Sequence, residues 1–175
     1  MTAPTWSVRR VHALDDAQID ELATVLIDCV EGGASVSFML PLSRDRAVAF
    51  WRRVAHGVAA GERALIIAED AQGLCGTVQL VLDQPENQPH RAELSKMLVH
   101  RRARRQGLGA ALMRAAEASA RECGKTLLVL DTANDESERL YERLGWTRVG
   151  MIPDYALLPH GGLCGTTVYY RNLSS

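Results

Sequence analysis

Apolar residues recur along the chain at two spacings, and stretches of the two kinds follow one another. Apolar positions three and four residues apart predict four helices, which begin at Asp16, after Ser43, after Gly109 and near Asp135. Shorter apolar or alternating runs predict seven strands, at residues 6–11, 64–69, 74–82, 91–99, 126–131, 147–151 and 166–172. No linker or internal repeat separates these elements, so we expect a single α/β domain over residues 1–175.

Two segments depart from both spacings. Residues 34–42 are mostly apolar but follow neither period, and Pro41 lies near the end of the segment. This composition is too apolar for an ordinary solvent-exposed loop, so we expect the segment to cover a small ligand. In the strand at 91–99 the alternation loses its phase around Lys96, which predicts a β-bulge there.

The overall composition is that of a folded globular domain. Hydrophobic residues make up 47% and charged residues 23% of the 175 positions, which excludes an intrinsically disordered chain. A chain of this length supports one hydrophobic core. No run of about 18 apolar residues occurs, and residues 1–6 lack the basic start and apolar stretch of a secretory signal. We therefore expect a cytoplasmic protein with no membrane partner.

Charge and cysteine content exclude further classes. The 20 Lys and Arg residues balance 21 Asp and Glu residues, and the formal net charge of −1 predicts no nucleic-acid partner. The four cysteines are widely spaced and have no histidine close by, which predicts free thiols and no metal site. One group departs from the even distribution of charge: Arg101, Arg102, Arg104 and Arg105 lie within five residues.

The arginine group runs directly into a glycine turn, Gly107-Leu108-Gly109, between the strand that ends at Val99 and the next helix. Alternate glycines let backbone N–H groups converge on one point, and the helix N-terminus adds partial positive charge. The segment therefore predicts a cradle for a diphosphate. A Rossmann dinucleotide site is excluded, because Leu112 takes the place of its third glycine, and no P-loop sequence occurs. Two glycines alone fit a plain tight turn equally well.

Two motifs at a defined separation resemble a known superfamily. Residues 99–109 resemble the acyl-CoA-binding signature Gln/Arg-x-x-Gly-x-Gly/Ala of the GNAT superfamily of acetyl-CoA-dependent N-acetyltransferases. Asn134, Tyr141 and the Gly-Trp pair that follows resemble its second signature. The resemblance extends over residues 91–151. Arg101 stands where the superfamily usually has proline, which leaves the backbone cradle intact and adds charge beside it.

The resemblance implies a fold and a co-substrate. The fold is a mixed, mostly antiparallel central sheet with about four flanking helices and a V-shaped splay between the fourth and fifth strands. The co-substrate is acetyl-CoA, with its pyrophosphate on the glycine turn and its pantetheine arm along the fourth strand. The implied binding residues are Met97, Leu98, Val99, Arg104, Arg105, Gln106, Gly107, Leu108, Gly109, Ala110, Asn134 and Ser137. Asn134 fits a cap of the fourth helix at least as well.

Acetyl transfer to an amine requires a base for the ammonium, a donor for the oxyanion and an acid for the leaving thiolate. Glu93 matches the base carboxylate of histone-type members of the superfamily, and an ion pair with Arg91 or Lys96 is the alternative. Tyr141 matches the tyrosine that the superfamily places near the CoA sulfur as general acid, and a core tyrosine is the alternative. The oxyanion donor is expected to be a backbone N–H near Leu98.

The acceptor is expected to be the amine of a small antibiotic or toxin. Residues 31–39 resemble the matching loop of tabtoxin-resistance acetyltransferases, and the chain also fits the description of kasugamycin 2'-N-acetyltransferases. The candidate substrate-binding residues are Asp28, Glu31, Ser35, Phe38, Glu93, Asp131, Asp154 and Tyr155. Because five of these are acids, which attract cationic amines, we rank an aminoglycoside such as kasugamycin ahead of a β-lactam dipeptide.

Three other questions stay open at the level of sequence. A protein N-terminal or lysine acetyltransferase would need an open groove, which the apolar segment 34–42 disfavours. A noncatalytic acyl-CoA-binding regulator would have no use for Glu93 and Tyr141. Pairing of the C-terminal strands would give a homodimer, and a monomer fits equally well.

Overall fold

The helices and strands follow the order that the apolar spacing predicts. The computed structural model describes residues 3–174. Its elements are β1 (Ser7–Val11), α1 (Asp16–Glu31), α2 (Arg44–Ala59), β2 (Arg63–Asp70), β3 (Gly73–Val81), β4 (Arg91–Val99), the short 3₁₀ helix η1 (Arg101–Ala103), α3 (Leu108–Glu122), β5 (Leu127–Thr132), α4 (Asp135–Arg143), β6 (Thr147–Leu157) and β7 (Leu163–Asn172). Within the described part of the chain, no helix combines the length and apolar character needed to span a membrane.

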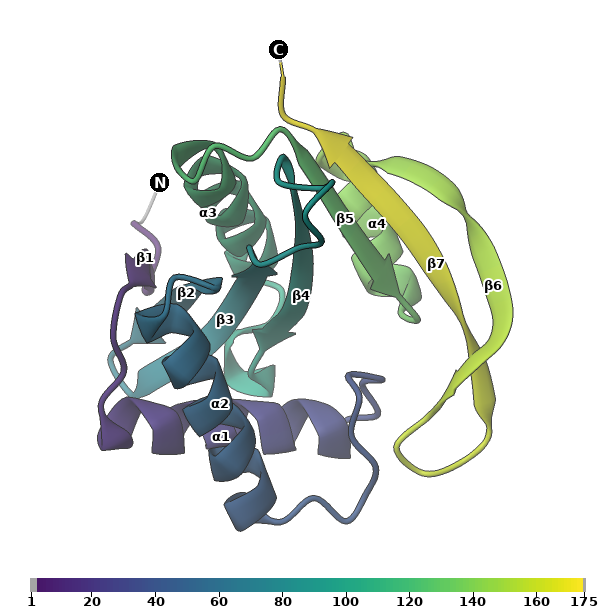
Figure 1. The fold of residues 1–175 in the computed structure, drawn as a ribbon. Coiled ribbons are helices and arrows are strands. Elements are labelled where there is room, and N and C mark those ends of the chain that lie inside the picture. Colours follow the sequence, from purple (N-terminus) through teal and green to yellow (C-terminus); the bar gives the residue numbers. More distant parts are fainter. Residues whose placement is uncertain (1–2, 175) are drawn as a thin grey trace.

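The seven strands form one mixed sheet that opens between its fourth and fifth strands. The strand order is β1-β2-β3-β4-β5-β7-β6, and neighbours are antiparallel except for the parallel pair β4 and β5. That pairing covers only residues 91–93 of β4 and 127–129 of β5, after which the two strands diverge (Figure 1). The V-shaped splay implied by the sequence resemblance is therefore confirmed, and it lies at the carboxyl ends of β4 and β5.

Helices cover the sheet on two faces, and each face has its own apolar core. α1 and α2 pack fully buried side chains, including Leu26 and Trp51, against one face. α3 packs Leu112 and Met113 against the other face, where Tyr141 of α4 joins the same cluster. Each fully buried aliphatic side chain contributes about 1.5–3 kcal/mol relative to an exposed one. These two cores fix β4 in place and make it a rigid wall of the splay.

The predicted β-bulge is present in β4. The register with β3 shifts there, so that Lys96 and Met97 together oppose one residue of β3. Lys96 has a φ of 52°, in the left-handed region. In a regular strand, Leu94 and Leu98 would share a face, because they are four positions apart. The bulge inverts the alternation, so Leu94 packs in the α3-side core and Leu98 packs in the α1/α2-side core. The bulge thus sets which side chains of β4 face the splay.

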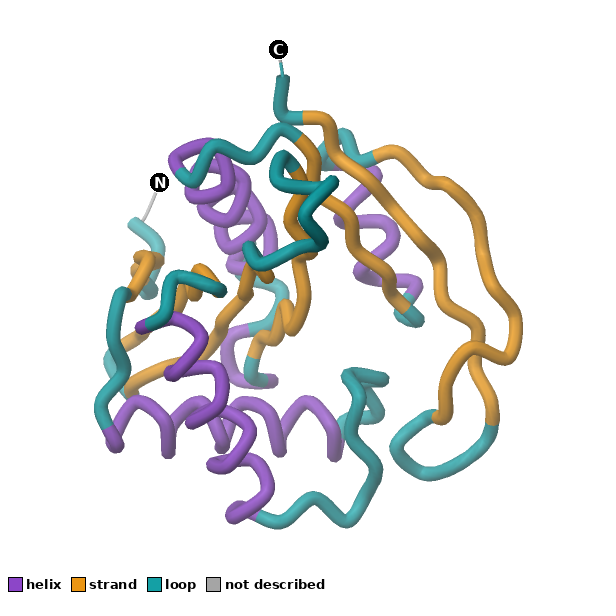
Figure 2. Tube along the Cα trace, in the orientation of Figure 1, coloured by secondary structure: helices purple, strands orange, loops and turns teal. Residues whose placement is uncertain are grey.

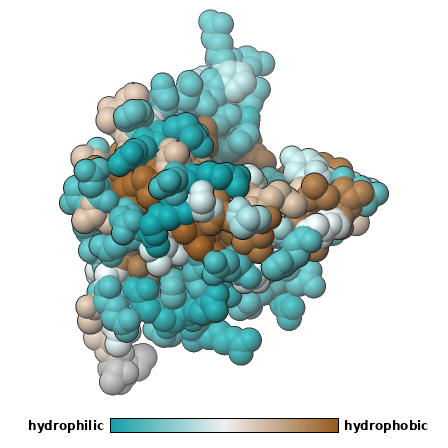
Figure 3. Space-filling view, turned by 90° about the horizontal axis from the view of Figure 1, so that it is seen from below, coloured by the Kyte–Doolittle hydropathy of each residue, from teal (hydrophilic) through white to brown (hydrophobic). Residues whose placement is uncertain are grey.

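The last two strands are longer than the sequence predicts and form a projecting hairpin. The sequence analysis ends β6 at Met151, but the strand runs to Leu157, and β7 begins at Leu163. Two register irregularities in β6 disrupt its alternation and explain the short prediction. Figure 3 shows apolar side chains gathered on this projecting part. The exposed ones include Val149, Met151, Ile152, Tyr155, Leu157 and Leu163.

Candidate active site

A cavity of about 400 Å³ fills the splay between β4 and β5. A second cavity of about 240 Å³ adjoins it on the side of the β6–β7 hairpin. The two share Ser35, Asp131, Thr132 and Ala133 as lining residues. The loop between α1 and α2 runs alongside the hairpin (Figure 2), where the Leu40 N–H donates to the Pro159 carbonyl at 3.0 Å. The loop and the hairpin together wall the second cavity.

The N-terminus of α3 faces the first cavity without a side-chain cap. Asp15, Ser43 and Asn134 each accept a backbone hydrogen bond at the starts of α1, α2 and α4. α3 instead follows Gly107, which has a φ of 79° and offers no side chain. The first N–H groups of α3 are therefore available to a ligand, and the helix dipole favours an anion there. The start of α3 is therefore suited to an anionic group, and the diphosphate predicted from sequence remains a prediction.

Eleven of the twelve residues predicted to bind acetyl-CoA line the first cavity: Met97, Leu98, Val99, Arg104, Arg105, Gly107, Leu108, Gly109, Ala110, Asn134 and Ser137. Gln106 does not, because its side chain turns back and Nε2 donates to the Arg102 carbonyl at 3.2 Å. Asn134 caps α4, accepting from the Ser137 N–H at 3.0 Å, as the alternative interpretation proposed. Among residues 3–174, no three His, Cys, Asp or Glu side chains are grouped so as to hold a metal ion.

Half of the arginine group anchors the turn instead of facing the cavity. The Arg101 N–H donates to Asp28 Oδ2 at 2.9 Å, and its guanidinium binds the same carboxylate. The Arg102 guanidinium makes two 3.1 Å hydrogen bonds with Asp70, and these hold the pKa of the Asp70 carboxyl below its ordinary value. Of this arginine group, Arg104 and Arg105 are the two that line the cavity.

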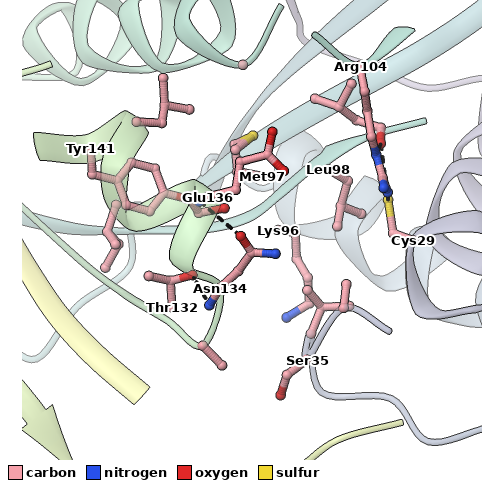
Figure 4. Close-up of a pocket in the computed structure, with 18 of the residues that line it drawn as sticks. Cys29, Ser35, Lys96, Met97, Leu98, Arg104, Thr132, Asn134, Glu136 and Tyr141 are labelled. Carbon is pink, nitrogen blue, oxygen red and sulfur yellow. Dashed lines mark hydrogen bonds between the residues drawn. The ribbon is translucent and has the colours of Figure 1, made fainter. Parts of the chain in front are cut away.

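Tyr141 lines the cavity from α4 and extends toward Met97 of β4 (Figure 4). Its side chain is buried, and burial raises the pKa of the hydroxyl to about 12. The tyrosine is therefore protonated at neutral pH and can donate a proton. Its ring also packs against Trp146 and Tyr169, at centroid distances of 6.1 and 5.9 Å, so the same residue belongs to the core.

Glu93 lines neither cavity. It lies in the paired part of β4, opposite Val129 of β5 and before the strands diverge. Its side chain is half-exposed, and Oε1 accepts from the Arg91 guanidinium at 3.2 Å. The ion pair with Arg91, the alternative to a base role, is therefore the interaction that the structure contains.

Half of the predicted substrate-binding residues line a cavity: Ser35, Phe38, Asp131 and Tyr155. The others, Asp28, Glu31, Glu93 and Asp154, do not. Asp28 is buried against the turn, Glu31 is exposed at the end of α1, and Asp154 is exposed at an irregularity of β6 with a φ of 53°. Of the five acids, Asp131 alone reaches the site, where its Oδ2 accepts from Thr166 Oγ1 at 2.7 Å.

Lys96 is the main cavity residue that the sequence analysis did not assign to the site. It lies in the β4 bulge and its side chain enters the cavity (Figure 4). The loss of alternation around Lys96 was the available signal. Ser37 and Met39 also line the second cavity, and they lie in the loop at residues 31–39 that the sequence analysis singled out without assigning them to the site. The remaining unassigned lining residues include Cys29, Leu130, Thr132, Ala133, Glu136, Leu140, Arg143, Leu157 and Thr166.

Replacing Asp28 with asparagine is expected to raise the KM for acetyl-CoA about tenfold while kcat stays close to that of the wild type. Charge-assisted hydrogen bonds contribute about 1.5–3 kcal/mol, and here they hold Arg101 at the start of the turn that leads into the cradle. Steady-state kinetics with varied acetyl-CoA measure the change. Asp20→Asn is the matched control, because Asp20 lies on the same helix and pairs with Arg44 at the surface. Equal KM values for the two variants would show that Asp28 does not position the cradle.

A helix N-terminus without a side-chain cap, facing a splay between two parallel strands, is compatible with a transferase that binds an acyl-CoA. A family model agrees with this class. The model of the acetyltransferase (GNAT) family matches residues 32–146, about two thirds of the chain, and the chain belongs to that family. The protein is therefore an N-acetyltransferase with acetyl-CoA as its co-substrate.

Solved structures share the fold over nearly the whole chain. A proposed acetyltransferase from Salmonella typhimurium, solved with its cofactor acetyl-CoA, is 20% identical with a TM-score of 0.79 and covers 98% of this chain and 95% of its own. A phosphinothricin acetyltransferase from Sinorhizobium meliloti, in complex with acetyl-CoA, is 19% identical with a TM-score of 0.79 and coverages of 96% and 88%. A ribosomal-protein-alanine N-acetyltransferase from Brucella melitensis is 19% identical with a TM-score of 0.80 and coverages of 95% and 99%.

Proposed function

We propose that this N-acetyltransferase acetylates the amine of a small molecule, of the kind carried by antibiotics and toxins. The observation that carries the proposal is the second cavity. Its volume of about 240 Å³ lies below the ~300–1,000 Å³ of pockets that take drug-sized ligands. The loop between α1 and α2 closes one side of it through the Leu40–Pro159 hydrogen bond. A bound peptide would need an open groove at this place.

The cavity residues supply groups for each demand of the reaction. Asp131 attracts the acceptor ammonium; an amine with a pKa of ~10.4 is only about 0.04% neutral at pH 7. We assign Asp131 as the base that accepts the ammonium proton, directly or through water. The oxyanion donor in this proposal is a backbone N–H group of β4 near Leu98, next to the bulge. Tyr141 gives a proton to the leaving thiolate, because its pKa of about 12 keeps it protonated.

The site changes the ranking of the two small acceptors considered from sequence. Kasugamycin ranked first because five acids were expected around the acceptor. Of these five acids only Asp131 lines a cavity, and it is the one carboxylate among the lining residues of the second cavity. An aminoglycoside carries several ammonium groups, and each favours its own carboxylate. The single carboxylate of the second cavity therefore supports a toxin-type acceptor with one reacting amine, and a β-lactam dipeptide such as tabtoxin now ranks ahead of an aminoglycoside.

A panel of acceptors tests the proposed function. The purified protein would be incubated with acetyl-CoA and, in turn, a tabtoxin-type dipeptide, L-phosphinothricin, kasugamycin and an alanine-starting peptide of a ribosomal protein. We expect CoA thiol release, and the mass gain of one acetyl group, with a small amine and not with the peptide. Acetylation of the peptide alone would contradict a small-molecule acceptor. Binding of acetyl-CoA without thiol release for any amine would favour the noncatalytic regulator.

A further inference from the structure

Lys96 presents an ammonium group to the cavity without a carboxylate partner. Its Nζ donates to Ser37 Oγ at 3.2 Å and lies 5.8 Å from the centroid of the Phe50 ring. None of the ion pairs within 4.0 Å among the described residues includes Lys96. Removal from water lowers the pKa of this lysine, and the positive charge of Arg63 adds to the effect. A desolvated cation held only by a hydroxyl and a ring is costly, and an anionic ligand would offset that cost.

Asp131 carries the opposite charge on the facing strand. It lies near the end of β5, across the splay from the β4 bulge that holds Lys96. The negative charge of Asp131 acts on Lys96, yet the two do not form an ion pair within 4.0 Å. Each instead makes a hydrogen bond with a hydroxyl: Asp131 Oδ2 accepts from Thr166 Oγ1, and Lys96 Nζ donates to Ser37 Oγ. The two charges therefore frame the junction of the cavities.

We propose that Lys96 and Asp131 together select a zwitterionic acceptor, in which Asp131 binds the amine to be acetylated and Lys96 binds an anionic group of the same molecule. This inference rests on the proposed small-amine function and narrows its substrate to amino acids or short peptides with a free carboxylate, or to molecules of the same charge pattern. Lys96 also repels a second ammonium group, which disfavours polycationic amines. Ser37 supports the arrangement by orienting the lysine ammonium toward the second cavity, which that serine lines.

An alternative role for Lys96 is that of general base in its neutral form, which its lowered pKa would favour. The two roles differ in their dependence on the substrate. A base acts on every amine alike, whereas an anion-binding group acts only on acceptors that carry the anion. The two roles of Lys96 can therefore be separated by comparing an acceptor that has a free carboxylate with its uncharged C-terminal amide.

The test measures kcat/KM for L-amino acids and dipeptides and for their C-terminal amides, using the wild type, Lys96→Met and Lys96→Arg. We expect the wild type to prefer the best acid over its amide by about 100-fold. Lys96→Met should lower kcat/KM for that acid about 100-fold and for the amide less than about threefold, and Lys96→Arg should retain most of the preference. Methionine removes a desolvated charge and leaves an unbranched side chain that is one heavy atom shorter, so the melting temperature should not fall.

Each outcome has a defined consequence. Equal losses for acid and amide in Lys96→Met would overturn anion binding and favour the base, with the proposed small-amine function intact. A wild-type preference for amides, simple monoamines or kasugamycin would also overturn the zwitterion proposal and keep the function. No transfer to any small amine, with acetyl-CoA binding intact by calorimetry, would overturn the proposed function itself and the zwitterion proposal with it.

Discussion

Replacing Tyr141 with phenylalanine is expected to lower kcat about 10²–10³-fold and to change the KM for acetyl-CoA by less than about threefold. The substitution removes only the hydroxyl that lines the cavity, and the ring keeps its packing against Trp146 and Tyr169. Without that proton donor the thiolate leaves as an anion in a poorly hydrated site. Thiol release at saturating acetyl-CoA measures the loss, and a thermal unfolding curve checks that the fold is retained.

Tyr169→Phe is the matched control for this prediction. Tyr169 is buried in the same aromatic cluster, but its hydroxyl donates to Glu142 Oε1 at 2.9 Å and it lines neither cavity. We expect a lower melting temperature and an unchanged kcat for this variant. Because the pKa of Tyr141 is about 12, the tyrosine should also cause no fall in wild-type kcat between about pH 7 and pH 9. Similar kcat losses in the two variants would contradict the acid role.

The fold could be predicted from sequence because its signals are local. Asp15 and Ser43 cap helices at the predicted positions, and each bond spans three residues. The signal of the glycine turn is local too. The start of α3 lacks a side-chain cap because Gly107, the residue directly before the helix, has no side chain. The hairpin end of β6 was missed because register irregularities break the alternation on which the prediction depends.

The charges of the site could not be predicted in the same way, because their partners lie far along the chain. Asp28 and Arg101 are 73 residues apart, and nothing near either one indicates that they neutralise each other. Lys96 and Ser37 are 59 residues apart. A bulge also changes which face a side chain takes, so the position of Glu93 in the alternation did not show whether it faces the splay. Sequence therefore predicted the cavity lining around the glycine turn more completely than the lining around the expected acceptor, where only half of the predicted residues line a cavity.

Replacing Gly109 with valine is expected to raise the Kd for acetyl-CoA more than about 100-fold and to leave the melting temperature nearly unchanged. A Cβ at this position would lie 3.1 Å from Leu140 Cδ2 and 3.9 Å from Met97 Cε, and the added methyl groups would occupy the cavity floor in front of the α3 N–H groups. Gly109 lies within α3 and has no positive φ, so valine adds no backbone strain and has a slightly better helix propensity than glycine. Isothermal titration with acetyl-CoA measures the affinity.

The control for Gly109→Val is Ala118→Val, on the exposed side of the same helix. Valine costs this helix position only about half a kcal/mol, and Ala118 lines neither of the two cavities. Its affinity for acetyl-CoA should equal that of the wild type. Comparing the two variants separates two effects. A general effect of valine on α3 would appear in both variants, whereas loss of the close approach of acetyl-CoA to the backbone would appear only in Gly109→Val. Wild-type affinity in Gly109→Val would place the diphosphate away from the glycine turn and would require another anion site for acetyl-CoA.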